Sequence, residues 1–216
     1  MGMVKVSAFS LSLDGFGAGP KQDINNPLGI KGGELHHWMY KTRMFHQMIG
    51  KEGGTTDFDN DMAEKSMENV GAWIMGRHMF GPVHGPWPDE TWRGWWGEEP
   101  PYHTPVFVLT HHKRQPLVMT GGTTFYFVND SIESVLKQAK EKAQNKDIRI
   151  GGGVAVIRQY LQAGLIDELH LVYSPVFLGA GESLLAGINL PSLGYNSMSY
   201  TARPDATHMF LRREDR

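Results

Sequence analysis

The 216-residue sequence contains no cysteine. This absence excludes disulfide bonds, thiol catalysis and zinc sites built from cysteine, and it is typical of a reducing compartment, so we expect a cytoplasmic protein. The sequence also lacks an excess of either charge, because 21 Lys and Arg residues stand against 23 Asp and Glu residues, a net charge of −2. Such a chain has no global field that recruits nucleic acid or an anionic membrane. We therefore expect neither as a partner.

Long hydrophobic runs are missing as well. No uninterrupted apolar stretch approaches the ~20 residues that a membrane-spanning helix needs. Residues 1–13 alternate in polarity, unlike the charged and then apolar pattern of a signal peptide. A chain of 216 residues suits one domain with a sizeable core. We therefore predict a single domain over residues 1–216 and no membrane association.

Three common ligand-binding motifs are also absent. The dinucleotide fingerprint requires a third glycine where Val156 stands, and its ribose-binding acid should end the next strand, which Asp167 instead begins. Gly50 and Lys51 are followed by Glu52, so there is no P-loop. No His-Glu-x-x-His occurs, and the histidines lack metal-ligand spacing. We expect no metal.

Residues 147–181 read as a strand, a triple glycine, a helix, a second strand and a glycine loop. Ile148 and Ile150 begin the strand, the helix has apolar residues at helical spacing, and Gly164 stands where a helix ends. Glycines between a strand and a helix direct free N–H groups and the positive helix end toward an anion, most often a phosphate. A tight turn without a ligand is the alternative. The sequence of the turn is compatible with both alternatives. Its residues are Gly151, Gly152, Gly153 and Val154.

Two further apolar strands end in cationic residues. Residues 72–75 are followed by Gly76, Arg77 and His78, and these two cations could grip a phosphate through charge-assisted hydrogen bonds. Residues 106–110 end in the densest charge cluster of the chain, which either surrounds a 2′-phosphate on a ribose or forms a solvated loop. The cluster consists of His111, His112, Lys113 and Arg114.

The first strand and a tryptophan-rich segment offer further candidates. Residues 4–13 are followed by a glycine-rich loop, 14–20, which is either a lid over a ligand or an ordinary surface turn. Segment 81–102 is rich in proline and tryptophan, and its tryptophans pack a core edge, form a dimer surface or line a flat aromatic pocket. Packing or a dimer interface is favoured, so we expect a homodimer. The candidates for a substrate pocket are Trp38, on an expected helix over 34–48, Trp87 and Trp92.

Strands alternate with helices along most of the chain, and residues 198–202 and 207–211 are typical of a closing antiparallel hairpin. The order and spacing of several motifs closely resemble the dihydrofolate-reductase-like superfamily, nearest to the C-terminal reductase domain of riboflavin biosynthesis. These motifs are Ser12 to Phe16, Met75 to Phe80, Val108 to Thr110, Gly151 to Gly153, Gly164 to Leu169 and Pro175 to Gly179. The resemblance implies a single-domain α/β three-layer fold with a mostly parallel central sheet and an antiparallel C-terminal hairpin.

The resemblance also implies NADPH bound along the strand ends. It places Gly76, Arg77 and His78 at the pyrophosphate, and Gly151 to Val154 on its other side. Toward the 2′-phosphate it places Thr110, His111, His112 and Arg114. Beside the nicotinamide it places Ala8, Gly15 and Phe16.

Two departures from the resemblance concern the chemistry. The zinc-binding deaminase domain of the bifunctional relatives has no counterpart, so only a reductase activity is expected. No acid matches the proton donor of the folate enzymes, although hydride transfer to a C=N or C=C bond needs a proton for the adjacent atom. The candidates are Asp14, Glu34 and Asp57, and water is the alternative.

We therefore expect an NADPH-dependent reductase that acts on a small pterin- or pyrimidine-like heterocycle. One alternative is a module of the same fold that binds a nucleotide or other ligand without turnover. A second is a reductase of the 5-amino-6-ribosylaminouracil-phosphate type, and a third is a structural protein whose aromatic segment serves dimerisation.

Overall fold

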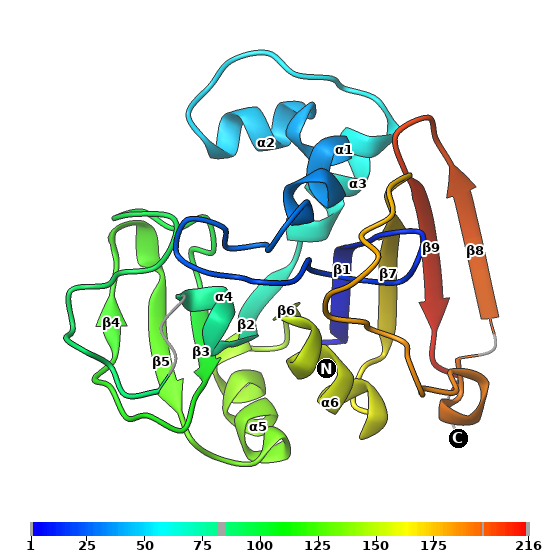
Figure 1. Cartoon of the computed structure of the whole chain (residues 1–216). Helices are drawn as coiled ribbons and strands as arrows, with labels where there is room; N and C mark the ends of the chain where they lie inside the picture. Colours follow the sequence, from blue (N-terminus) through cyan, green and yellow to red (C-terminus); the bar gives the residue numbers. More distant parts are fainter. Residues whose placement is uncertain (1, 82–84, 196, 215–216) are drawn as a thin grey trace. The chain divides into compact units, whose positions relative to one another are not determined.

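The computed structural model describes residues 2–81, 85–195 and 197–214. It divides into two compact units. Unit 1 contains residues 1–5 and 69–165, and unit 2 contains residues 6–68 and 166–216. Strand β1 (Val4–Leu11) contributes its first two residues to unit 1 and the rest to unit 2 (Figure 1).

Unit 1 is a mainly parallel sheet in which apolar strands pair side by side. Its strand order is β4-β5-β3-β2-β6-β1, and only the short β4 pairs antiparallel to its neighbour. Each inner strand is largely buried, as expected for a parallel sheet covered by helices. The strands are β2 (Val70–Gly76), β3 (Pro105–Leu109), β4 (Leu117–Val118), β5 (Thr124–Val128) and β6 (Asp147–Gly152).

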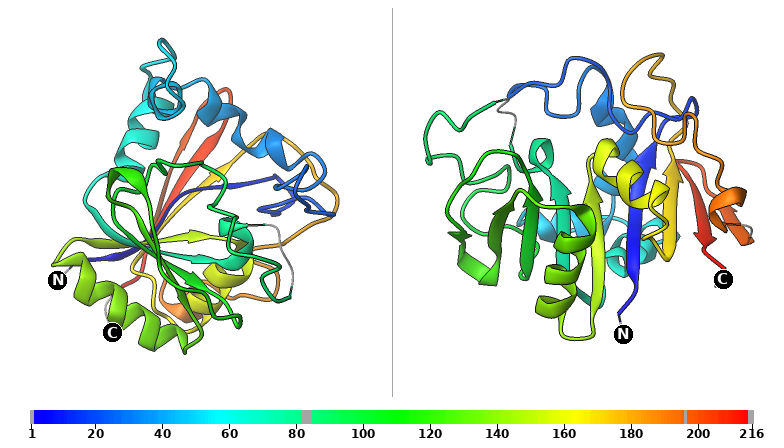
Figure 2. Two further views of the ribbon diagram at one scale, coloured as in Figure 1. Left: turned by 90° about the vertical axis from the view of Figure 1, so that its left-hand side faces the viewer. Right: turned by 90° about the horizontal axis from the view of Figure 1, so that it is seen from below.

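The helices of unit 1 are α4 (Arg77–Phe80), α5 (Ile132–Ala143) and α6 (Val154–Gln162), with a 3₁₀ turn over Thr120–Gly122. Ser131 caps the start of helix α5, because its side chain accepts a hydrogen bond from the backbone N–H of Ser134. Helix α6 buries the apolar stripe expected from the sequence, and Gly164 has the positive φ of a C-terminal cap. The Tyr160 hydroxyl donates to the Ile132 carbonyl at 2.9 Å, which joins the two neighbouring helices (Figure 2).

Unit 2 combines the antiparallel end of the chain with short helices. Its strand order is β1-β7-β9-β8, and β7, β9 and β8 pair antiparallel. The expected hairpin is present as β8 and β9. The elements are the 3₁₀ helices over Gly32–His36 and Pro191–Leu193, α1 (His37–Tyr40), α2 (Arg43–Met48), α3 (Phe58–Met67), β7 (Glu168–Tyr173), β8 (Ser197–Ala202) and β9 (Thr207–Arg212).

One expected element is wrong, because the chain does not form a single helix over 34–48. The buried Thr42 breaks it: its hydroxyl donates to the Met39 carbonyl at 2.7 Å and accepts from the Phe45 N–H at 3.2 Å. A threonine in this role ends one helical segment and caps the next. The expected α/β class, with a mostly parallel sheet and an antiparallel C-terminal hairpin, is confirmed. A single domain stays a prediction.

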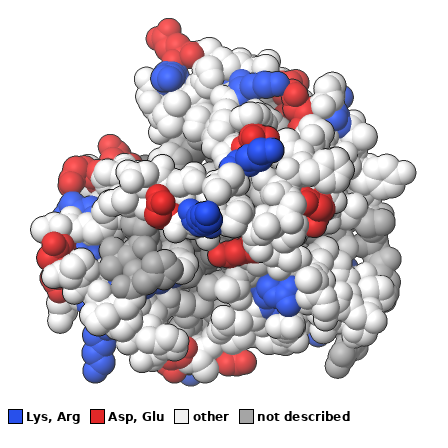
Figure 3. Space-filling model, in the orientation of Figure 1, with Lys and Arg blue, Asp and Glu red and all other residues white. Residues whose placement is uncertain are grey.

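Surface charges do not gather into a patch of one sign on the side of the molecule seen in Figure 3, where basic and acidic side chains are interspersed. Among the described residues, no helix combines the length and the apolar character needed to cross a bilayer.

The packing of α6 generates a stability prediction. Ile157 is fully buried, whereas Gln159 on the same helix is exposed. We expect Ile157→Ala to lower the free energy of unfolding by about 2 to 5 kcal/mol, since the cavity left behind closes only in part. Gln159→Ala, the matched control, should change it by less than about 0.5 kcal/mol. Urea denaturation followed by circular dichroism measures both, and equal effects would show that α6 is not a core element.

Candidate functional site

Three groups of predicted residues come together in unit 1 because their strands are parallel neighbours. Strands β6, β2 and β3 lie side by side, with Met75 opposite Gly152 and Gly76 opposite Leu109. A Cβ placed on Gly76 would lie 3.6 Å from the Gly153 nitrogen. The glycine turn, the start of α4 and the loop after β3 therefore share one edge of the sheet, where ligands bind in open α/β sheets.

The glycine turn is shaped for close approach. A side chain at Gly151 would place its Cβ 3.1 Å from the Trp73 ring, and Gly152 has a φ of 122°, a conformation that other residues rarely adopt. The Gly152–Gly153 peptide bond is cis. Gly153 is the N-cap of α6 and offers no side chain to its first N–H groups. This helix end therefore has the polarity and the open backbone that an anion requires.

Arg77 has unused hydrogen-bonding capacity at the same edge. Its guanidinium lies over the Trp87 ring at 3.7 Å, and Nη1 donates to the Gly85 carbonyl. Nε and Nη2 are buried and have no hydrogen-bond partner among the described residues. Burial lowers the pKa of Arg77, with a further contribution from the charge of Arg114. A partly buried cation with two unused donors fits an anionic group, since buried polar atoms are otherwise paired.

The loop after β3 is ordered around Thr110. The Thr110 hydroxyl accepts from the His112 N–H at 3.1 Å, and the His112 carbonyl accepts from Trp87 Nε1 at 3.1 Å. His111 lies exposed, with Nδ1 at 3.1 Å from Asn129 Oδ1. Trp87 thus contacts both Arg77 and this loop. His78 is exposed on the first turn of α4.

Arg114 does not take the position expected for a ligand of the 2′-phosphate. It is buried, and Nη2 donates to the Glu90 and Trp92 carbonyls at 2.7 Å each. Its guanidinium also lies 5.0 Å from the Phe127 ring. We therefore correct this assignment, because Arg114 fastens segment 85–97 from within instead of presenting its charge to solvent.

The three tryptophans expected in a substrate pocket are occupied in packing, which corrects that assignment. Trp92 donates to the Phe80 carbonyl at 2.8 Å, and Trp87 packs between Arg77 and the ring of Phe127. Trp38 is 1% exposed in the core of unit 2, where Nε1 donates to the Ser10 hydroxyl. The start of the expected pocket segment, residues 82–84, lies outside the described residues.

Two of the three candidate proton donors have structural roles. Asp14 is exposed and accepts from the N–H groups of Leu178 and Gly179 at 3.1 and 2.7 Å. Hydrogen bonding, with the Ser12 side chain as the largest contribution, lowers the pKa of Asp14, so this carboxylate is ionised at neutral pH. Asp57 caps α3 through a hydrogen bond from the Asn60 N–H. Both assignments as proton donor are therefore corrected.

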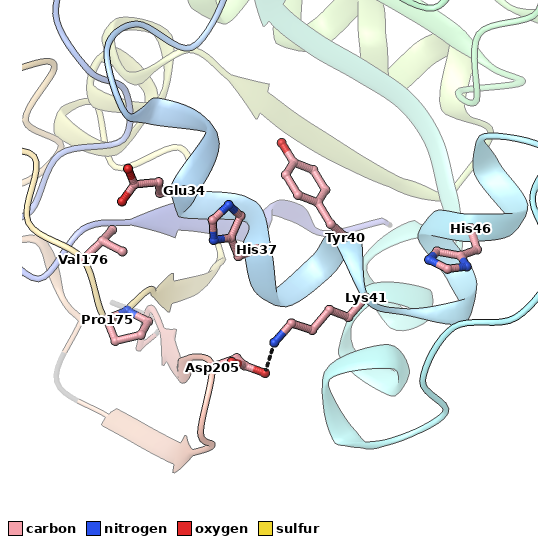
Figure 4. Close-up of a pocket in the computed structure, with 8 residues that line it drawn as sticks. All are labelled: Glu34, His37, Tyr40, Lys41, His46, Pro175, Val176 and Asp205. Atoms are coloured by element: carbon pink, nitrogen blue, oxygen red, sulfur yellow. Dashed lines mark hydrogen bonds and ion pairs between the residues drawn. The ribbon is translucent and has the colours of Figure 1, made fainter.

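Glu34 lines a pocket of about 640 Å³ in unit 2 (Figure 4). The pocket walls come from the 3₁₀ helix over Gly32–His36, from α1 and α2, and from the loops beside β7 and β9. Lys41 pairs with Asp205 at 2.8 Å on its border. Of the three candidate acids, Glu34 is the one that lines this pocket. The other lining residues are His37, Tyr40, His46, Pro175 and Val176.

Ala8, Gly15 and Phe16 lie in unit 2 along the first strand and the loop after it. Ala8 has a φ of 52° within β1, and its N–H donates to His170 Nδ1 at 3.2 Å. Gly15 also has a positive φ, and the Phe16 N–H donates to the Ser12 hydroxyl at 2.9 Å. Sequence reasoning missed His170 and the residues connected to it. The available signal was a histidine within each of two apolar strands.

The mainly parallel sheet with its antiparallel C-terminal hairpin defines an α/β protein. The chain belongs to the RibD C-terminal domain family, whose model matches residues 5–208. This family confirms the resemblance seen in the motifs.

Individual relatives agree with this family. Riboflavin biosynthesis reductase Rib7 of Saccharomyces cerevisiae is 12% identical over 98% of this chain and 89% of its own, with a TM-score of 0.54. A Thermotoga maritima diaminohydroxyphosphoribosylaminopyrimidine deaminase/5-amino-6-(5-phosphoribosylamino)uracil reductase is 12% identical over 98% of this chain and 56% of its own, with a TM-score of 0.53. At these identities the two structures show a shared fold.

One curated relative matches part of the chain. The uncharacterized protein YyaP of Bacillus subtilis (strain 168) is 30% identical over 95 residues. The match covers 42% of this chain, and the chain spans half of the length of that relative.

The role of Arg114 yields a prediction. Arg114→Met keeps most of the side-chain length and removes the donors to the Glu90 and Trp92 carbonyls. We expect a loss of about 1.5 to 3 kcal/mol in the free energy of unfolding, typical of hydrogen bonds to a charged group, and faster amide exchange in residues 89–93. Lys113→Met removes the neighbouring exposed cation and should change neither. Unchanged exchange in the Arg114 variant would refute its clamping role.

Proposed function

We propose that this chain is an NADPH-dependent reductase that reduces a C=N or C=C bond of a small, flat, pyrimidine- or pterin-like heterocycle. The observation that carries the proposal is that Gly76 lies against Gly153, where α6 begins without a side-chain cap, and is followed by Arg77 with its two unused donors. The family supports it, since the two structural relatives described above are named as reductases, one of them acting on a substituted uracil.

The residues at the sheet edge fit the phosphates of this cofactor. Gly151, Gly152 and the N-terminus of α6 would hold the pyrophosphate, because the N–H groups at the start of a helix attract an anion and Gly153 offers them no capping side chain. The Arg77 guanidinium would neutralise it by charge-assisted hydrogen bonds. His111 and His112 would lie toward the 2′-phosphate, without Arg114. When bound, NADPH supplies the hydride.

The proton that accompanies the hydride needs its own source. Hydride addition to one atom of the double bond leaves a negative charge on the other, which a proton must neutralise. Asp14 is bonded to the backbone of a loop and Asp57 caps α3. Glu34 is therefore the acid that fits this role best, because it lines a cavity. Water is the alternative donor.

The quaternary structure and the location belong to the same proposal. The proposal keeps the homodimer expected from the tryptophan-rich segment, in which Trp96 is 39% exposed. A cytoplasmic location is part of the proposal, and the lack of cysteine supports it.

The cofactor proposal is tested by titrating the protein with NADPH and with NADH under calorimetry. We expect Arg77→Ala to weaken NADPH binding by about 1 to 3 kcal/mol, or roughly 5- to 150-fold. Lys137→Ala, which removes an exposed cation on α5, serves as the matched control and should bind like the wild type. Thermal unfolding of both variants shows whether the loss reflects binding or folding.

The outcomes distinguish the candidate functions. No response to near-millimolar NADPH would refute the cofactor assignment. Tight binding without oxidation across a panel of pyrimidines and pterins would favour a binding module. Turnover with a ribosylaminouracil phosphate would identify a reductase of riboflavin biosynthesis.

A further inference from the structure

A continuous chain of hydrogen bonds runs through the interior of unit 2 and ends on the backbone of β1. Asp59 Oδ1 lies 3.1 Å from His208 Nε2, and His208 Nδ1 lies 2.9 Å from His170 Nε2. His170 Nδ1 in turn lies 3.2 Å from the Ala8 nitrogen. These groups, which we call the buried histidine chain, come from α3, β9, β7 and β1. Asp59 is 6% exposed, His208 is 0% exposed and His170 is 8% exposed.

The direction of every hydrogen bond in this chain is determined by its last member. The Ala8 N–H can only donate, so His170 Nδ1 must accept and the proton of a neutral His170 lies on Nε2. That proton is donated to His208 Nδ1, which leaves the proton of His208 on Nε2, directed at the Asp59 carboxylate. A proton added to His170 Nδ1 would oppose the Ala8 N–H. Both histidines are therefore neutral and both carry the proton on Nε2.

The surroundings of the buried histidine chain keep both of its histidines neutral. The rings of Trp38 and Phe58 pack edge-on against His208 at 5.1 and 5.3 Å, and Phe210 stacks on His170 at 4.2 Å. Burial lowers the pKa of His208 and raises that of Asp59, although each is partly compensated by the other. Arg203 and Asp57 are the further charged groups that act on this pair.

The backbone at Ala8, where the buried histidine chain ends, is unusual. Ala8 has a φ of 52° inside a strand, a left-handed conformation that a side-chain-bearing residue adopts at an energetic cost. Such residues persist where the surrounding structure holds them, and they are concentrated at ligand sites. The buried histidine chain supplies that restraint, since it takes the Ala8 N–H out of ordinary strand pairing.

We propose that His170 is a positioning residue that holds the Ala8 backbone in its left-handed conformation, and that Asp59 acts through His208 to select the required His170 tautomer. This role rests on the proposed function, because Ala8 matters to hydride transfer only if the cofactor ring lies beside it. Displacing Ala8 should therefore slow hydride transfer more than it weakens NADPH binding.

The first test requires no activity. In ¹⁵N-labelled wild type at pH 7, the imidazole spectra of His170 and His208 should show neutral rings protonated at Nε2. His170→Phe keeps a ring against Phe210 but removes the acceptor, so the Ala8 amide resonance should shift. His170→Gln retains an acceptor oxygen and should restore part of that shift. A cationic His170, or one protonated at Nδ1, would overturn the proposal.

The second test separates positioning from folding. In His170→Phe and Asp59→Leu we expect single-turnover hydride transfer to slow by roughly ten- to a hundredfold, as for a small misplacement of reacting groups, with the NADPH Kd changed less than about threefold. Asp59→Asn keeps an acceptor and should retain the rate. Asp61→Leu, an exposed acid on the same helix, is the matched control.

The outcomes of the two tests are distinguishable. An unchanged rate and an unchanged Ala8 resonance in His170→Phe would overturn the proposal. Equal losses of rate and affinity would indicate a general structural role and would overturn it as well. If the wild type binds no NADPH, the proposed function fails and the positioning role fails with it, whereas the spectra still decide whether the buried histidine chain sets the Ala8 backbone.

Discussion

The parallel pairing of β6, β2 and β3 is the constraint on which the candidate site depends. Parallel neighbours end at the same edge of a sheet, so the segments that follow them must meet there. Because of this pairing, the Gly151 to Gly153 turn and Arg77 become neighbours although more than seventy residues separate them. Without it, each would be an ordinary strand end.

Two arginines near this edge show how burial assigns different roles to the same side chain. Arg114 directs its guanidinium into backbone carbonyls, so its charge is used in holding a loop. Arg77 shares the same aromatic neighbour, Trp87, but keeps two donors unused among the described residues. A buried cation needs compensation. For Arg114 two backbone carbonyls supply part of it, although its Nη1 has no partner among the described residues. Arg77 donates to one carbonyl and has two further donors that a bound anion would pair.

Local patterns predicted the elements that depend on local physics. The strand, glycine turn and helix between residues 147 and 162 were predicted correctly, since hydrophobic period and glycine content determine them. The break at Thr42 was missed, because a threonine can either cap or continue a helix, and only the hydrogen bonds that its hydroxyl makes in the fold decide which. Trp38 was assigned to a pocket but lies in a core, a difference that the sequence around it does not encode.

The sequence by itself determined the α/β class, the glycine turn before α6 and the family, because these follow from periodicity and from motifs in a fixed order. The tertiary structure alone decided which polar side chains meet. Asp59 and His208 are separated by 149 positions, and His170 contacts His208 diagonally because the β7–β9 register sets His170 opposite Phe210. Contacts of this kind depend on register and on the packing of distant elements, and no local pattern specifies either.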